Sequence, residues 1–451
     1  MQSPITPASQ SVFVLLMGAM RSVLGKRGLT KIFGGKLASA SGLMSLSTAS
    51  AGLLGYVFHV LMGRMLSTED YGTFGAMIAL YVVLVTPLGT LMMVIARKVS
   101  EYRAMEDAGR VAHFYYWISF RTAAVGIVVL SVYFFVAPQV QSYLKVPTIM
   151  PVYMLGVLLL LAFLPFINNA FLQGLQRFNW LFASGSFNGV FRIAFSVALV
   201  WLGFGLTGAM GGIVLGAFAT WLITYGALYP SLAQGRHAQE SAHLSLKRAM
   251  PVFIADATFA VMTQIDMVLV NYYFPAPEAG LYAAASILGK AVMYFPGGIA
   301  MALFPMVAEN QARNERSAHL LLQAVGLTAL LCGVGAIFYF VFGEAIIRLL
   351  FGQTYYGAGE ALRIFGFAMF PMTLVLIAQR FLIAKGHTLF AYLSVLIAPL
   401  QLLAIHVYHD SLRMVVVVLG VVGSLLVLLS YGLMWRIYRG AQYTWDVKSE
   451  T

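Results

Sequence analysis

The chain has 451 residues, of which 60% are hydrophobic and only 10% are charged. A soluble domain carries about 25% charged residues, so this composition excludes a large soluble core and favours a polytopic membrane protein. The single cysteine, Cys332, excludes an intramolecular disulfide and a zinc site built on several thiolates.

The segment before the first predicted span, residues 1–41, is basic and carries a short apolar run at 11–20. We expect no cleavable signal peptide, because the basic residues follow this run instead of preceding it. Residues 11–37 are more typical of an interfacial helix with its cations at the lipid headgroups. These cations are Arg21, Lys26, Arg27, Lys31 and Lys36.

Runs of about 20 apolar residues, the length that crosses the hydrocarbon, predict twelve spans and an all-α fold. They are 42–66, 74–97, 114–137, 149–173, 179–203, 206–229, 249–274, 280–306, 317–342, 358–380, 388–408 and 413–436. Two six-helix bundles, 42–230 and 249–436, follow, joined by a linker at 231–248 and trailed by a tail at 437–451. Because each bundle has an even number of spans, the repeats are parallel, related by an axis along the membrane normal, with a cavity between them.

The two halves also resemble each other in sequence: the stretch 63–104 returns 208 positions later as 271–312. The matched pairs are Gly72 with Gly280, Gly89 with Gly297, Val99 with Val307 and Glu101 with Glu309. Internal repetition of this kind is typical of transporters. Prolines also fall in matching spans, as hinges or as ordinary membrane-helix prolines. They are Pro87, Pro165, Pro296 and Pro371.

The basic residues predict the orientation of the spans. The N-terminal segment, the loops after even-numbered spans and the tail together carry 20 lysines and arginines, against 5 on the opposite side. The positive-inside rule therefore places both termini and the linker in the cytoplasm.

Five charged residues lie well away from the ends of the predicted spans: Arg121, Arg192, Lys290, Asp256 and Asp266. A charge at the centre of a span costs about 3 kcal/mol even on a lenient scale, so each needs a partner, a water-filled cavity or a function. Helical spacing aligns Arg192 and Lys290 with polar stripes, and a third stripe runs along the first span. The stripes are Ser184, Asn188, Arg192 and Ser196; Tyr282, Ser286, Lys290 and Tyr294; and Ser45, Thr48, Gly52, Tyr56, His59 and Gly63.

These stripes predict a central cavity shared by both halves, although each charge also has a plainer interpretation. Arg121 has the length to snorkel to the headgroups. Arg192 and Lys290 are also interpretable as structural cations, neutralised by Asp256 or Asp266. The two aspartates and His59 are candidates for ion or proton coupling, and packing is the alternative for each.

Three short segments resemble one family. The segment GRMLSTEDYGTFGAM, the stretch Glu278–Tyr282 after the aspartate Asp266, and FLQGLQRF at Phe171–Phe178 are similar to the polysaccharide-transport flippases. The resemblance implies the multidrug/oligosaccharidyl-lipid/polysaccharide exporter fold. It also implies a lipid-linked oligosaccharide substrate, alternating access and a bacterial inner-membrane location.

An undecaprenyl diphosphate-linked sugar is anionic, so a cationic cavity with hydroxyl and aromatic partners fits it. The predicted binding residues are Arg192, Lys290, Arg121, Asn188, Ser286, Tyr56, Tyr282 and Tyr294. We expect contacts with membrane lipids and with a polysaccharide polymerase complex, and no cofactor, metal, catalytic residue or nucleic-acid partner, since no nucleotide or metal motif is present.

Two other functions stay open. A proton- or sodium-coupled exporter of drugs or organic cations would need a net acidic cavity, in which Asp256 and Asp266 are the cation sites. An integral-membrane polysaccharide polymerase or ligase would need a sizeable extracytoplasmic loop, and the longest one predicted here, at 342–357, is small.

Overall fold

The computed structural model describes residues 36–233, 249–293 and 318–449, with a few single positions between 296 and 307. This part of the chain is helical and contains no strand. The expected interfacial helix at 11–37, apart from its last two residues at the start of α3, lies outside the described residues, and so does the predicted site residue Tyr294.

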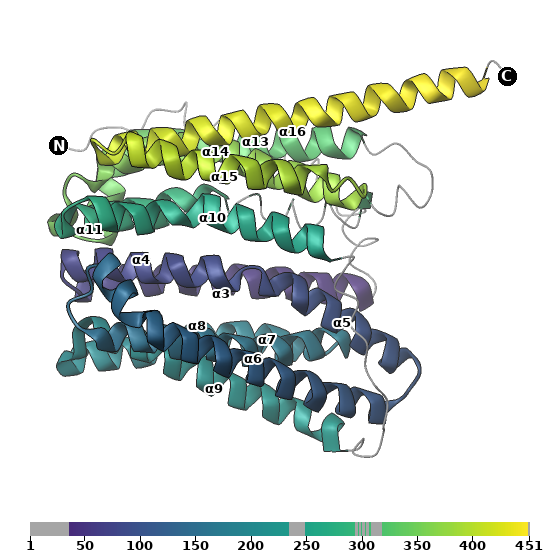
Figure 1. Ribbon diagram of the computed structural model, residues 1–451, viewed down its shortest axis with the longest axis horizontal. Coiled ribbons are helices and arrows are strands. Elements are labelled where there is room, and N and C mark those ends of the chain that lie inside the picture. Colours follow the sequence, from purple (N-terminus) through teal and green to yellow (C-terminus); the bar gives the residue numbers. More distant parts are fainter. Residues whose placement is uncertain are drawn as a thin grey trace, which may run out of the picture.

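The helices form two lobes, one above the other in Figure 1. The N-terminal lobe comprises α3 (Lys36–Met65), α4 (Thr68–Val85), α5 (Leu88–Ala104), α6 (Ala108–Tyr143), α7 (Ile149–Gly174), α8 (Phe178–Leu199) and α9 (Gly205–Ala233). The C-terminal lobe comprises α10 (Met250–Tyr273), α11 (Ala276–Gly289), α13 (Ala318–Leu350), α14 (Ala358–Ala384), α15 (Leu389–Val407) and α16 (Leu412–Ser449).

Within the described residues, nine helical stretches are long and apolar enough to cross a membrane. One of them, Phe178–Ala233, contains two helices, α8 and α9. The chain reverses its direction between them at Gly203 and Gly205, whose φ angles are positive. The second predicted span is broken: α4 ends at Val85, and Pro87, which lacks a backbone donor, is the N-cap of α5. Pro165 and Pro371, by contrast, lie inside continuous helices.

The helix bounds follow the 208-residue offset found in the sequence. Shifted by 208 positions, α6, α7 and α8 would cover 316–351, 357–382 and 386–407, and α13, α14 and α15 lie there within three residues. The matched glycines also meet: a Cβ placed on Gly72 would lie 2.6 Å from the backbone nitrogen of Gly280. Because equivalent residues touch each other, the pseudo-twofold axis relating the lobes passes between these glycines.

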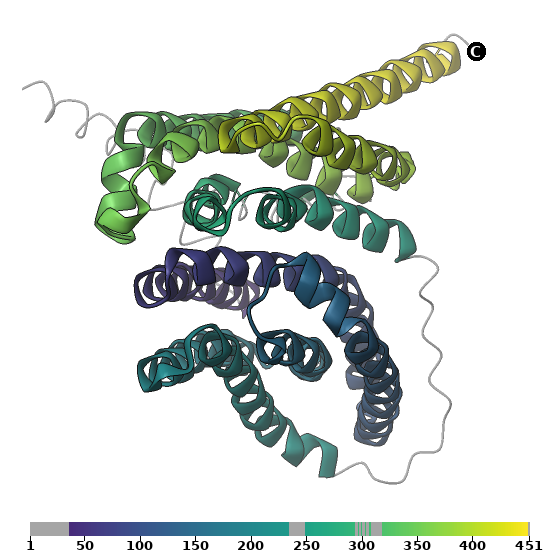
Figure 2. The ribbon, with the colours of Figure 1, turned by 60° about the vertical axis from the view of Figure 1, so that its left-hand side comes forward.

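The lobes meet where α4 packs against α10 and α11, and where α3 packs against α11 (Figure 2). The largest hydrophobic cluster crosses this contact, and its fully buried members include Phe74 of α4 and Tyr282 of α11. We call the end that carries the turns at 66–67, 144–148, 274–275 and 351–357 the closed end. The opposite end, with the turns at 105–107, 175–177 and 385–388, is the linker end.

Candidate functional site

A buried ion pair lies at the centre of the C-terminal lobe. The Lys290 ammonium is 2.9 Å from Oδ1 of Asp266, and the side chains are 8% and 0% exposed. The hydroxyl of Tyr282 donates to the other carboxylate oxygen of Asp266 at 2.8 Å. Two donors therefore satisfy this carboxylate, and the centre carries no net charge.

The sequence of α10 and α11 explains this geometry. Asp266 lies about two turns before the end of α10, and Tyr282 lies about two turns after the start of α11, so the turn at 274–275 brings the two to the same depth. Lys290 follows two turns after Tyr282 on the same face and reaches back towards the closed end, the direction in which side chains tilt on α11. The structure thus pairs Lys290 with Asp266, one of the two acidic partners considered above.

Arg192 occupies a different environment in the N-terminal lobe. Its guanidinium lies over the ring of Phe58, 4.5 Å from the ring centroid, and within 3.6 Å of the position that a Cβ on Gly55 would take. Its Nε is buried without a hydrogen-bond partner, and none of the ion pairs between described residues includes it.

Arg192 and Lys290 therefore have different contacts: Arg192 lies over Phe58 in the N-terminal lobe, and Lys290 pairs with Asp266 in the C-terminal lobe. Two hydroxyls of the Arg192 stripe bond inside the N-terminal lobe: Ser184 to the Asn169 side chain at 2.8 Å, and Ser196 to the Ala209 carbonyl at 2.9 Å. Ser286, on the Lys290 stripe, is buried in the C-terminal lobe. Asn188, Tyr56 and His59 are half-buried, and the ring of His59 contacts Phe58 and Phe74.

Arg121 is exposed on α6, and its guanidinium lies 4.3 Å from the ring centroid of Trp117, one turn nearer the linker end. This direction agrees with the snorkelling interpretation. No ion pair joins it to another described residue.

The carboxylate of Asp256 on α10 interacts with polar side chains of both lobes. Thr90 of α5 donates to it at 3.3 Å, Gln379 of α14 donates at 2.9 Å, and the Arg380 guanidinium lies 3.3 Å away. The sequence indicated Asp256, but not these three partners. The adjacent polar side chains of Gln379 and Arg380, at the end of an otherwise apolar span, are the signal that would have drawn attention to them.

Comparison with protein families identifies the chain. A family model described as "Polysaccharide biosynthesis protein" matches residues 37–311, more than half of the chain. The chain belongs to this family. A second model, MatE, matches residues 251–407, and both families are members of the multidrug/oligosaccharidyl-lipid/polysaccharide exporter superfamily. No curated protein matches the chain.

Solved structures show the same fold. A multidrug resistance MATE family transporter in an inward-facing conformation aligns with a TM-score of 0.74 at 14% identity, over 87% of this chain and 96% of its own. The lipid II flippase MurJ, in an inward closed conformation, aligns with a TM-score of 0.68 at 16% identity, over 86% of this chain and 87% of its own. The chain is thus a multi-pass membrane protein of a transporter superfamily, as its sequence predicted.

Proposed function

We propose that this family member is a flippase, not an enzyme, that moves a diphosphate-linked oligosaccharide lipid from the cytoplasmic to the periplasmic leaflet of a bacterial inner membrane. The two bundles at 42–230 and 249–436 would open to each side in turn, with both termini in the cytoplasm. A polysaccharide polymerase would then take up the flipped product.

The observation that carries this proposal is the unbalanced charge of Arg192. Lys290 has its counter-ion, but within the described residues no acidic side chain pairs with Arg192 and no hydrogen-bond acceptor reaches its buried Nε. A buried cation without a counter-ion is costly, and a guanidinium matches a phosphate group with two parallel hydrogen bonds. An anionic ligand would balance this charge. Asn188, about one turn before Arg192 on α8, and Tyr56 on α3 would then bind sugar hydroxyls.

The test uses Arg192→Gln and Arg192→Lys, expressed in a strain that lacks its own copy of the protein. Surface polymer, normalised to the amount of protein in the membrane, should fall by about tenfold or more in the Gln variant, since a charge-assisted bond to the substrate is lost. The Lys variant keeps the positive charge but loses the two parallel hydrogen bonds of a guanidinium. Its amount of surface polymer should therefore lie between those of the wild type and the Gln variant. Normal export by Arg192→Gln would overturn the proposal.

Lys290→Gln is the matched control. It leaves the Asp266 carboxylate buried without its cation, so it should lower the amount of folded protein, and Asp266→Asn in the same chain should restore it. Arg192→Gln breaks no such pair and should fold normally. If both variants instead lose folded protein to the same extent, Arg192 is structural.

For energy coupling we propose Asp256 over Asp266. Asp266 is fully occupied by Lys290 and Tyr282, whereas Asp256 binds Thr90 across the lobe contact and its side chain remains 12% exposed. Ion or proton binding at Asp256 would thus act on the contact between lobes. His59 packs its ring against Phe58 and Phe74, so packing already accounts for it.

The MatE match at 251–407 favours a cation exporter as a second candidate. That function predicts the opposite outcome: Asp256→Asn would abolish efflux of organic cations, and Arg192→Gln would leave it intact.

A further inference from the structure

Two aromatic side chains of the C-terminal lobe are inserted into the N-terminal lobe at the closed end. They are Phe351, which follows α13, and Tyr355, the last residue of the short helix η3 (Gln353–Tyr355). Both are buried. A Cβ on Gly63 of α3 would lie 2.5 Å from the Phe351 ring, so this ring needs a glycine there, and the Tyr355 hydroxyl donates to the Gly63 carbonyl at 2.9 Å. We call Phe351 and Tyr355 the clasp.

A continuous row of buried rings runs from the clasp to Arg192. Tyr71 of α4 contacts both clasp rings, at centroid distances of 5.7 and 5.9 Å. Tyr71 also stacks on Phe74, and Phe74 meets Phe58 of α3 edge to face at 5.9 Å. The row ends at Phe58, whose ring lies under the Arg192 guanidinium. The three rings between the clasp and the guanidinium are almost completely buried.

The packing of this row makes the position of each ring depend on its neighbours. Buried rings are close-packed, so a ring that turns leaves its neighbours without contacts unless they move as well. Packed cores answer such a change by switching between discrete arrangements. At the Arg192 end a charge as well as packing holds the ring of Phe58, because a cation is attracted to an aromatic face. Removing the guanidinium from this ring therefore weakens the hold on the row.

We propose that the clasp is the gate of the closed end, and that the rings of Phe58, Phe74 and Tyr71 couple its release to the binding of an anion at Arg192. A bound diphosphate draws the guanidinium off Phe58 and into paired hydrogen bonds with phosphate oxygens. The row then repacks, and the clasp leaves Gly63. The empty protein stays shut at this end and the loaded one opens. This inference rests on the proposed function, because it takes Arg192 as the site of the ligand.

The first test needs no ligand. Hydrogen exchange of the purified full-length protein, read by mass spectrometry, reports how often the backbone at 351–357 opens, because the amides of Gly352, Tyr355 and Tyr356 are hydrogen-bonded there. Phe58→Leu keeps a buried apolar side chain and removes the ring that joins the row to the guanidinium. It should raise the exchange rate at 351–357 by about fivefold or more, the lower end of typical coupling between sites.

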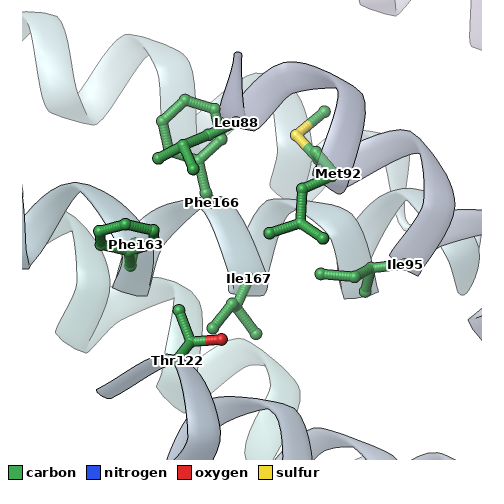
Figure 3. Close-up of a pocket in the computed structure, with 8 residues that line it drawn as sticks. Leu88, Met92, Ile95, Thr122, Phe163, Phe166 and Ile167 are labelled. Carbon is green, nitrogen blue, oxygen red and sulfur yellow. The ribbon is translucent and has the colours of Figure 1, made fainter. Parts of the chain in front are cut away.

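Phe114→Leu is the matched control. Phe114 is as fully buried as Phe58, but its ring contacts lie in a separate hydrophobic cluster of the N-terminal lobe. Figure 3 shows two other members of this cluster, Ile95 and Ile167, beside a space of about the size of one water molecule. This variant should leave the exchange at 351–357 unchanged. An equal rise in both variants would show general loosening and would overturn the coupling.

The double variant of Phe58→Leu and Phe351→Leu tests whether both changes act through one row. Phe351→Leu loosens the clasp itself, so it should also raise the exchange rate. A loosened clasp no longer depends on Phe58, so the double variant should exceed Phe351→Leu by less than about twofold. Two effects that multiply in full would mean that the residues act independently, and the coupling would be overturned.

The second test adds farnesyl diphosphate, and native mass spectrometry counts the bound ligand. In the wild type, the ligand should raise the exchange rate at 351–357 by about fivefold or more. Phe58→Leu should bind the ligand at least as tightly, because no ring competes for the guanidinium, but the ligand should cause no further rise. Arg192→Gln should not bind it.

The two tests separate the failure of this inference from the failure of the proposed function. A wild type that binds farnesyl diphosphate without any change at 351–357 would overturn the gate and leave the proposed function standing. A wild type that does not bind the ligand would overturn the proposed function and, with it, the release of the clasp by an anion. The coupling between Phe58 and the clasp would then be decided by the first test alone.

Discussion

The closed end and the linker end hold the two lobes together in different ways. Of the six hydrogen bonds between lobes in the described residues, five lie at the closed end. The sixth, from Thr90 to Asp256, lies in the half of the molecule nearer the linker end and is 3.3 Å long. The described structure is therefore joined firmly at one end and by a single side-chain bond towards the other.

The closed-end contacts come in two pseudo-equivalent sets. The end of α3 meets the end of α13, where Arg64 donates to the Leu350 and Leu349 carbonyls at 2.6 and 2.5 Å. The corresponding end of α10 meets the end of α6, where Asn271 donates to the Leu144 carbonyl at 2.6 Å and Tyr272 stacks on Tyr143. The 208-residue offset relates α3 to α10 and α6 to α13, so both sets follow from the repeat.

Most of these donors bond to backbone carbonyls at or just beyond helix C-termini, which lack partners within their own helices. Lys145, for example, donates to the Phe274 carbonyl at 3.1 Å. Tyr355 adds a bond to the Gly63 carbonyl, and because burial raises the pKa of Tyr355, its phenol stays protonated and remains a donor. If the lobes separated here, these carbonyls would lose their partners together, so the contact should open cooperatively.

The difference between the ends can be tested with pairs of spin labels, after Cys332→Ala removes the native thiol. Exposed positions Glu69 and Tyr356 report the distance between lobes at the closed end, and Arg103 and Thr388 report it at the linker end. Pulsed electron paramagnetic resonance then gives a distance distribution for each pair. Each variant below is compared with the unsubstituted labelled protein.

The largest effect is expected from Gly280→Val. A Cβ at Gly280 would lie 2.0 Å from the Thr68 carbonyl oxygen, and this backbone atom has no rotamer that relieves the clash. Overpacking costs about 1–3 kcal/mol. The ratio of molecules with separated closed-end labels to molecules with close labels should therefore rise by roughly 5- to 150-fold. Gly52→Val is the control, because no atom lies within 4 Å of its added carbon. An unchanged closed-end distance in Gly280→Val would show that the axis does not pass here.

This close approach was only partly predictable from the sequence. The matched glycines and the 208-residue offset were visible, and so were the apolar runs and the break at Pro87. That the two glycines touch each other was not, because an offset within a chain gives equivalence and not proximity. The spacing of residues along one helix does not predict which helix of the other half packs against it.

The candidate site was predictable to a smaller extent. Helical spacing placed Ser184 and Ser196 on the face of Arg192 and suggested that all three line a cavity. In the structure the two hydroxyls form hydrogen bonds with groups on neighbouring helices, as serines in membrane-spanning helices commonly do. The partners of Asp256 come from helices 123 and 166 positions away in sequence, and only the packing of the lobes selects them.

A smaller effect is expected at Arg64, on the rim of the closed end. Arg64→Gln removes a charge and the paired bonds to the last turn of α13, and since these bonds are exposed to solvent the loss should be about 1 kcal/mol. The fraction of molecules in which the closed-end labels are separated should therefore rise by roughly fivefold. The distances of the linker-end pair should not change. Arg64→Lys keeps a cation near the helix C-terminus and should give about half of the effect. Equal broadening at both ends would contradict a local role.

The smallest effect is expected from Thr90→Val, which keeps the shape of the side chain and removes only the hydroxyl that reaches Asp256. Gln379 and Arg380 still satisfy the carboxylate, so no buried charge is left unpaired and the loss should be about 0.5 kcal/mol. The fraction of molecules in which the linker-end labels are separated should rise by about twofold, and the closed-end distances should stay the same. This is the reverse of the Arg64 result. Gln379→Leu is the matched comparison, because it removes a bond of similar strength within one lobe and should leave both label pairs unchanged. If Thr90→Val instead moves the closed-end labels, the two ends are coupled through α5, and Asp256 acts on the whole contact and not only on its own end.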